Sequence, residues 1–198
     1  MTETTSARPK RRDRETLRQA VYAAVLEELV EHGYGGMTIE GVAAHAGAAK
    51  TSVYRHWPTK EELVLDTLHN VMPAAVEPPN TGSIRGDCLV MLRSIRESIT
   101  GPAGPVIGSL LGERTRHPQI AGVVVDTIFK PRQRLMLDAL HQAAARGEIA
   151  VGAVSLIPVL AATGLMLQHY LQQGTAPSEQ DITDFVDGAI LPIVGASG

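Results

Sequence analysis

The sequence is poor in cysteine and in aromatic residues, and it lacks the alternating apolar pattern of β-strands. Cys88 is the only cysteine among 198 residues, so no intramolecular disulfide can form and a cytoplasmic location is expected. The aromatic residues are four Tyr, two Phe and one Trp. Apolar residues recur three and four positions apart, which predicts an all-α protein.

The familiar motifs of enzymes and metal sites are missing as well. We find no Gly-x-Ser-x-Gly, His-Glu-x-x-His, Gly-x-x-x-x-Gly-Lys or Gly-x-Gly-x-x-Gly pattern. The seven histidines show no zinc-ligand spacing. We therefore expect no enzyme activity, no metal and no cofactor, and keep a helical enzyme without a recognisable motif as an alternative.

Negative charge exceeds positive charge overall, but the charges are unevenly distributed. The formal net charge of −3 argues against a general attraction to nucleic acid. Residues 8–18, in contrast, hold six basic residues against Asp13 and Glu15, namely Arg8, Lys10, Arg11, Arg12, Arg14 and Arg18. Such a segment can bind a polyanion, and it can equally be a solvated tail. We interpret residues 1–13 as a flexible basic arm.

One long stretch has no charged side chain at all. No Asp, Glu, Lys or Arg occurs from Ile149 to Ser178. The stretch is almost long enough to span a bilayer, although Gly152, Pro158 and Gly164 dilute it. A helix that is apolar all round must be buried, and a second subunit is the natural partner in a soluble chain. We expect a homodimer without membrane contact, and a membrane-tethered regulator remains the alternative.

Proline and glycine divide the chain into two parts. The segment "PAAVEPPNTG", residues 73–82, cannot form a regular helix and is interpreted as a hinge. Residues 14–72 before it show short amphipathic segments, and residues 83–198 after it show longer apolar helical patterns. These two parts are predicted to be separate domains.

Residues 38–57 have the pattern of a helix-turn-helix. Ala43 is small where two crossing helices touch, Gly47 suits a turn position with positive φ, and Val53 locks the second helix against the first. The second helix of such a unit enters the DNA major groove. Residues 50–57 are therefore the predicted recognition helix.

The segment "KTSVYRHWPTKEEL", residues 50–63, interleaves aromatic and basic residues. Val53 and Trp57 share the side expected to be buried, whereas Lys, Arg, Ser and Thr side chains on the other side can meet base edges. Tyr54 and His56 can donate to phosphates, and the helix starts at Thr38 and Lys60 favour anions. The alternative is that Tyr54 and Trp57 are core residues and the charges a solvated face. The predicted DNA contacts are Thr38, Lys50, Thr51, Ser52, Tyr54, Arg55, His56 and Lys60.

The segment "GYGGMTIEGVAAHAGAAKTSVYRHWPTKEELVLDTL" resembles the DNA-binding domain of the TetR family of transcriptional regulators. Ala48-Ala49 departs from the family's frequent Val-Ser, and Gly41 weakens the preceding helix. The resemblance implies a three-helix helix-turn-helix domain followed by a larger helical domain for ligand binding and dimerisation. It also implies a homodimer that binds double-stranded DNA at an inverted repeat, and we predict a repressor that a small-molecule effector releases.

The resemblance also implies a ligand pocket among the middle helices and a dimer interface built from the last two helices. The apolar character of the middle helices predicts a hydrophobic or aromatic effector, although each residue taken alone is as typical of a core. The predicted pocket residues are Met91, Ile95, Leu111, Phe129, Met136, Met166, His169 and Tyr170. The predicted interface residues are Leu160, Gly164, Leu167, Leu171, Phe185, Ala189 and Ile193.

Overall fold

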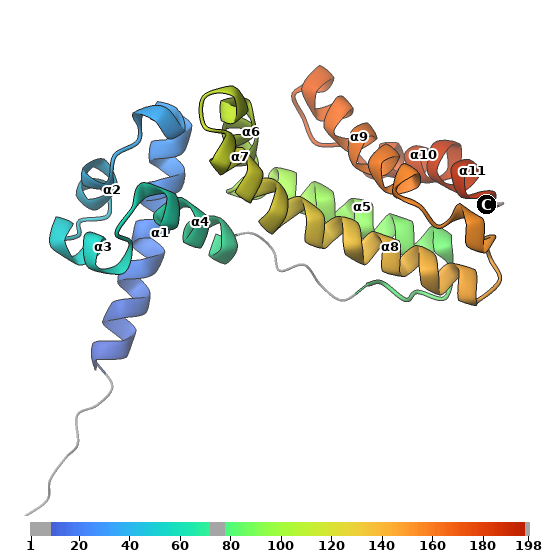
Figure 1. The fold of residues 1–198 in the computed structure, drawn as a ribbon, viewed down its shortest axis with the longest axis horizontal. Coiled ribbons are helices and arrows are strands. Elements are labelled where there is room, and N and C mark those ends of the chain that lie inside the picture. Colours follow the sequence, from blue (N-terminus) through green and yellow to red (C-terminus); the bar gives the residue numbers. More distant parts are fainter. Residues whose placement is uncertain (1–8, 72–77, 197–198) are drawn as a thin grey trace, which may run out of the picture. The chain divides into compact units, whose positions relative to one another are not determined.

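A computed structural model describes residues 9–71 and 78–196, which form helices and connecting turns with no strand among them (Figure 1). The predicted all-α class is confirmed. The chain divides into two compact units, Met1–Val71 with Pro105–Val124 and Met72–Gly104 with Val125–Gly198.

The second unit is built around α5, which packs against both α8 and α9. Buried apolar side chains from these helices and from the C-terminal run α10–η4–α11 form one core. Its elements are α5 (Ile84–Thr100), a π-helical turn η2 (Val125–Phe129), α8 (Lys130–Ala145), η3 (Val151–Ala153), α9 (Leu156–Gln173), α10 (Glu179–Phe185), a second π-helical turn η4 (Val186–Ile190) and α11 (Leu191–Val194).

Cys88 lies in the core of the second unit. Burial raises the pKa of its thiol to about 12, so the thiolate that reacts as a nucleophile is not formed at neutral pH.

The start of α10 is fixed by a capping box, in which Asp181 N–H donates to Ser178 Oγ at 3.2 Å and Ser178 N–H donates to Asp181 Oδ2 at 2.8 Å.

A buried carboxylate anchors the segment that precedes α5. Asp87 is completely buried and accepts hydrogen bonds from Thr81 N–H at 2.7 Å and Thr81 Oγ1 at 2.8 Å. Arg146, at the end of α8, pairs with the same carboxylate at 3.0 Å. A buried charge is tolerated when it is paired and hydrogen-bonded in this way.

The predicted division of the chain at residues 73–82 differs from the compact units. Residues 72–77 lie outside the described residues. Pro105–Val124, which the sequence places in the C-terminal domain, groups by its contacts with the first unit, and the predicted domain bounds stay a prediction. The periodicity of these residues identifies helices, but it carries no information about which core the helices join.

The first unit contains the N-terminal helices and the returning segment 105–124. α1 packs against α2 and α4, α2 packs against α3, and α4 contacts α7 (Figure 1). The elements are α1 (Pro9–Gly36), α2 (Ile39–His45), α3 (Lys50–His56), α4 (Lys60–Val71), α6 (Gly104–Gly112), η1 (Glu113–Thr115) and α7 (Pro118–Val124).

α1 begins earlier than the sequence indicated. Residues 9–13 were assigned to a flexible arm but form the first turns of α1, and residues 1–8 lie outside the described residues. Pro9 suits the first position of a helix because its ring presets φ and it has no N–H to satisfy. Near its other end α1 is kinked at Gly33, whose φ of 64° lies in the left-handed region.

α2 and α3 form the helix-turn-helix predicted for residues 38–57. Gly47 adopts a φ of 61° in the turn, and Ala48 N–H donates to Ala43 O at 2.8 Å. This bond satisfies a free carbonyl at the end of α2. Val53 and Trp57 are both buried, as predicted.

Gly41 is a poor helix former inside α2, but it has a packing role. A Cβ at Gly41 would lie 2.7 Å from Oε1 of Glu28, a carboxylate of α1 that is only 4% exposed. His45 of α2 pairs with the same carboxylate at 3.0 Å. Gly41 therefore allows α2 to lie over the buried Glu28.

We expect Gly41→Ala to destabilise the protein by about 1 to 2 kcal/mol, because overpacking against Glu28 outweighs the better helix propensity of alanine. Gly122→Ala is the matched control, since a Cβ at this position of α7 meets nothing within 4 Å. It should instead stabilise the protein slightly. Thermal unfolding of both variants checks the prediction, and an equal gain in stability for the two would contradict it.

Candidate nucleic-acid interface

α3 presents a polar face to solvent and an apolar face to the first unit. Val53 and Trp57 lie on the apolar face, and Ser52 is half-buried between the two faces. The exposed residues are Lys50, Thr51, Tyr54, Arg55 and His56. The structure thus brings six of the eight predicted DNA contacts together on one short helix.

Ser52 accepts hydrogen bonds from Arg55 and His56 on this face. Arg55 Nη2 donates to Ser52 Oγ at 3.4 Å, and His56 Nδ1 lies 2.8 Å from Ser52 O. A carbonyl oxygen only accepts, so Nδ1 carries the hydrogen in this contact. A cavity of about 320 Å³ is lined by Ser52, Arg55 and His56 together with Leu17 of α1.

Thr38 lies at the start of α2 and is exposed. Its Oγ1 accepts from Gly41 N–H at 3.0 Å, as expected of an N-cap residue. The hydroxyl hydrogen is not used by this bond. Ala49 precedes the first residue of α3 and makes no side-chain cap bond.

Lys60 is engaged by the protein itself. Its ammonium donates to the carbonyl oxygens of Tyr34 at 2.6 Å and Met37 at 3.0 Å, and lies 4.6 Å from the centre of the Tyr34 ring. Burial lowers the pKa of this ammonium. Lys60 thus ties α4 to the turn that follows α1, and its predicted contact with a DNA phosphate stays a prediction.

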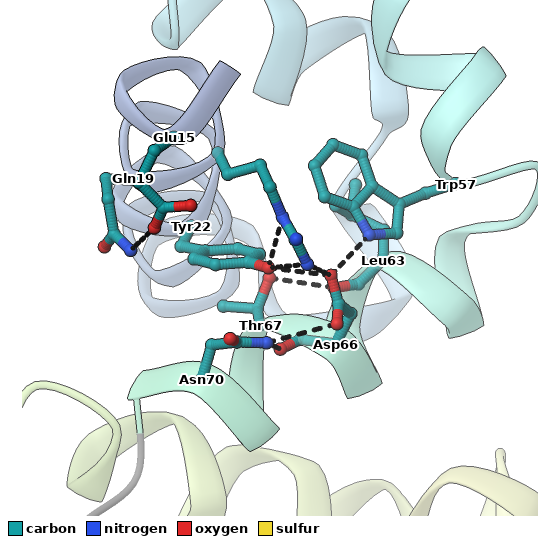
Figure 2. Close-up of polar contacts among 9 residues, drawn as sticks. Glu15, Gln19, Tyr22, Trp57, Leu63, Asp66, Thr67 and Asn70 are labelled. Carbon is teal, nitrogen blue, oxygen red and sulfur yellow. Dashed lines mark hydrogen bonds and ion pairs between the residues drawn. The ribbon is translucent and has the colours of Figure 1, made fainter. Parts of the chain in front are cut away.

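Asp66 of α4 joins three elements around the recognition helix (Figure 2). Its Oδ2 accepts from Tyr22 Oη at 2.8 Å, Trp57 Nε1 at 2.8 Å and Arg18 Nη2 at 3.1 Å. Tyr22 and Arg18 belong to α1, and Trp57 follows the last residue of α3. Hydrogen bonds to a charged acceptor are stronger than bonds between neutral groups. Asp66 therefore holds the C-terminal end of α3 against α1 and α4.

The protonation of this network follows from its contacts. Burial of Asp66 raises its carboxyl pKa, but hydrogen bonds from Tyr22, Trp57 and Arg18 outweigh burial, and the net pKa is below its usual value. Burial and the bond to Asp66 raise the pKa of Tyr22 to about 12. Asp66 is therefore charged at neutral pH, and the Tyr22 hydroxyl keeps its hydrogen.

Glu40 of α2 contacts two of the predicted DNA-binding side chains. Its carboxylate forms an ion pair with Lys50 and accepts from Tyr54 Oη at 3.1 Å. No pattern in the sequence pointed to Glu40, because its partners follow ten and fourteen positions later and meet it only where α2 and α3 cross. Asp66 was also missed, and its only sequence signal is a carboxylate beside the apolar residues of α4.

The predicted ligand-pocket residues are not all in one place. Met91, Met136 and Met166 are buried in the core of the second unit, and Ile95 packs against it. Leu111 belongs to the first unit. The other three are half-buried residues of the second unit, Phe129, His169 and Tyr170. A ligand pocket at these positions stays a prediction.

The predicted dimer-interface residues of α9 are exposed. Leu160 is 53% exposed, Leu167 51% and Leu171 69%, and Gly164 lies between them on the same helix. Ile193 of α11 is also exposed. The other two, Phe185 and Ala189, are half-buried, and the Phe185 ring lies edge-on to His169 at 6.1 Å between ring centres. Their place in an interface stays a prediction.

Both parts of the chain match described protein families. "Tetracyclin repressor-like, C-terminal domain" matches residues 78–189, and "Bacterial regulatory proteins, tetR family" matches residues 21–67. The chain belongs to the tetR family. The family predicted from the sequence is thereby confirmed, together with a role in the regulation of transcription.

Similar proteins agree with this assignment. The tetR-family chain is 34% identical over 175 residues to an HTH-type transcriptional regulator of Mycobacterium tuberculosis, covering 86% of this chain and 84% of the relative. A crystal structure of a TetR family transcription regulator has 26% identity and a TM-score of 0.64, over 92% of this chain and 99% of that chain. FadR of Bacillus subtilis, in complex with stearoyl-CoA, shares the fold with 16% identity and a TM-score of 0.69, over 89% and 97% of the two chains.

The described residues contain neither a membrane-spanning helix nor a cluster of metal ligands. Within residues 9–71 and 78–196, no helix combines the length and the apolar character that crossing a bilayer requires. In the same described part of the chain, no three His, Cys, Asp or Glu side chains gather as a possible metal site.

We expect Asp66→Asn to lower stability by about 1 to 3 kcal/mol at pH 7, because hydrogen bonds to a charged acceptor are lost. The folded-state pKa of Asp66 is depressed, so its contribution is present above the unfolded pKa of about 3.9 and disappears as the pH falls through the folded value. Unfolding in urea at pH 7 and at pH 3 measures this. Glu62→Gln, an exposed carboxylate on the same helix, is the control, and a variant difference that does not shrink at low pH would contradict the assignment.

Proposed function

We propose that the protein is a homodimeric repressor that binds an inverted repeat in double-stranded DNA and is released from it by a small, mostly apolar effector. The observation that carries the proposal is the two-sided character of α3. Its apolar side is buried through Val53 and Trp57, with Trp57 held by Tyr22 of α1 and Asp66 of α4, and its polar side is exposed to solvent.

We infer that the side chains on the polar side divide into two groups. Lys50, Thr51, Ser52 and Arg55 have the chemistry to meet base edges, since Lys and Arg bond guanine while Ser and Thr bond several bases. Thr38, Tyr54, His56 and Lys60 are proposed to hold phosphates. Lys60 would have to exchange carbonyl partners for a phosphate, so it is the weakest member of this group.

A dimer is proposed through α9 and the C-terminal helices. Leu160, Gly164, Leu167 and Leu171 follow one another at spacings of four, three and four residues, which places them along one side of α9. An apolar stripe of this kind is stabilised by burial against the same stripe of a second subunit. Two recognition helices can then meet half-sites about 34 Å apart.

The effector is proposed to be hydrophobic or aromatic and to enter among the helices of the second unit. Met91, Met136 and Met166 support this idea, because methionine side chains repack easily around a ligand. FadR, which has the same fold, is in complex with stearoyl-CoA. A ligand changes the DNA affinity only if it binds the two dimer shapes unequally.

The DNA-binding proposal is tested by selection of bound duplexes from a random pool at two salt concentrations. We expect the pool to converge on an inverted repeat. On that operator, Arg55→Ala should lower the affinity by about 1 to 3 kcal/mol if Arg55 bonds a base edge. Lys130→Ala is the matched control, because it removes an exposed cation from the second unit. A pool that never converges, or equal losses for the two variants, would refute the proposal.

The dimer proposal is tested at the centre of the α9 stripe. Leu167→Glu should produce monomers, because the charge would be desolvated in the interface. Val151→Glu is the control, since Val151 is 79% exposed and lies on η3, outside the stripe. Mass measurement by light scattering after gel filtration distinguishes the two species, with circular dichroism to check folding. A folded, dimeric Leu167→Glu protein would show that the interface lies elsewhere.

A further inference from the structure

We propose that Glu40 is an internal substitute for a DNA phosphate, an autoinhibitory contact that lowers the affinity of each recognition helix for DNA. The inference rests on the proposed role of α3 in DNA binding and adds a residue that none of the predicted contacts includes.

The contact links two helices on the exposed surface. Glu40 lies in the first turn of α2, and its Oε1 pairs with Lys50 Nζ and accepts from Tyr54 Oη at 3.1 Å. Lys50 Nζ also lies 5.6 Å from the centre of the Tyr54 ring. Three side chains therefore form a closed cluster over the face of α3 that would meet DNA.

The chemistry of this cluster is that of a phosphate contact. A carboxylate oxygen and a phosphate oxygen are both anionic acceptors, and an ammonium and a hydroxyl are donors suited to either one. The Tyr54 hydroxyl has a single hydrogen, so it cannot serve Glu40 and a phosphate together. While Lys50 is paired with Glu40, the two charges cancel at short range. DNA must displace the carboxylate before both donors become available.

The cluster is not needed to hold the two helices together. α2 and α3 pack against each other with Val42, Ala43 and Val53 buried, and Ala48 N–H donates to Ala43 O in the turn between them. Glu40 and Lys50 are both about half exposed. The hydrogen bond and charge of Lys50 lower the carboxyl pKa of Glu40, so the carboxylate is ionised at neutral pH. In the first turn of α2 this carboxylate also interacts favourably with the helix dipole, and Glu62 likewise lies in the first turn of α4.

The test compares full-length proteins on the selected operator duplex, with affinity measured by fluorescence anisotropy over a series of salt concentrations. Glu40→Gln removes the charge, and Glu62→Gln makes the same change in net charge on an exposed residue of α4. Exposed ion pairs are weak, so we expect Glu40→Gln to tighten binding only by about 2- to 5-fold per half-site relative to Glu62→Gln. The slope of log affinity against log salt should not change, because the number of neutralised phosphates is the same.

A second pair of variants ties the effect to Lys50. In a Lys50→Gln background, the gain from Glu40→Gln should be smaller, because only the Tyr54 hydroxyl is then left to be released. A titration by NMR in the absence of DNA should show the Glu40 pKa rising when Lys50 is replaced. Equal affinities of Glu40→Gln and Glu62→Gln would overturn the inference. Weaker binding by Glu40→Gln would also overturn it, since Glu40 would then position Lys50 and Tyr54 for DNA.

The outcome for the unmodified protein separates this inference from the proposed function. If the unmodified protein binds no duplex in a salt-dependent way, the DNA-binding proposal fails and the inference fails with it. If the unmodified protein binds its operator and Glu40→Gln behaves as Glu62→Gln does, only the inference fails.

Discussion

The Asp66 carboxylate accepts hydrogen bonds from Tyr22 and Arg18 of α1 and from Trp57 at the end of α3. α3 is a short helix, and isolated helices of such length are not stable in water. Its direction therefore depends on what holds its ends and its buried side. The turn at Gly47 fixes the start of α3, and Asp66 fixes its end through Trp57, so the polar face is presented in one orientation (Figure 2).

Donor groups near the polar face of α3 already have acceptors within the protein. The carboxylate of Glu40 binds the side chains of Lys50 and Tyr54. The ammonium of Lys60 donates to carbonyl oxygens at the end of α1 and in the turn that follows it. Carboxylates and carbonyl oxygens are the acceptors that compete with phosphate for the same donors. In the proposed DNA complex, the affinity is the difference between the contacts that phosphates make with these donors and the contacts that the donors already make in the free protein.

In the second unit, α9 carries apolar side chains both on its buried face and on its exposed face. On α9, Val159 and Met166 point into the core, whereas Leu160 and Leu167 are exposed. The sequence shows that this helix is apolar on all sides, which predicts burial of both faces. It does not show which face meets the core of the same chain, because apolar residues lie on both faces.

The amino-acid sequence by itself determined the all-α class, the position of the helix-turn-helix and the buried pair Val53 and Trp57. These features follow from local rules: helical periodicity, the positive φ of Gly47 and the capping of short helices. Only the tertiary structure decided that Asp66 clamps the recognition helix, that Glu40 meets Lys50, and that 105–124 joins the first unit. Those contacts join residues far apart in the chain, and their energy depends on how helices cross rather than on spacing within any one of them.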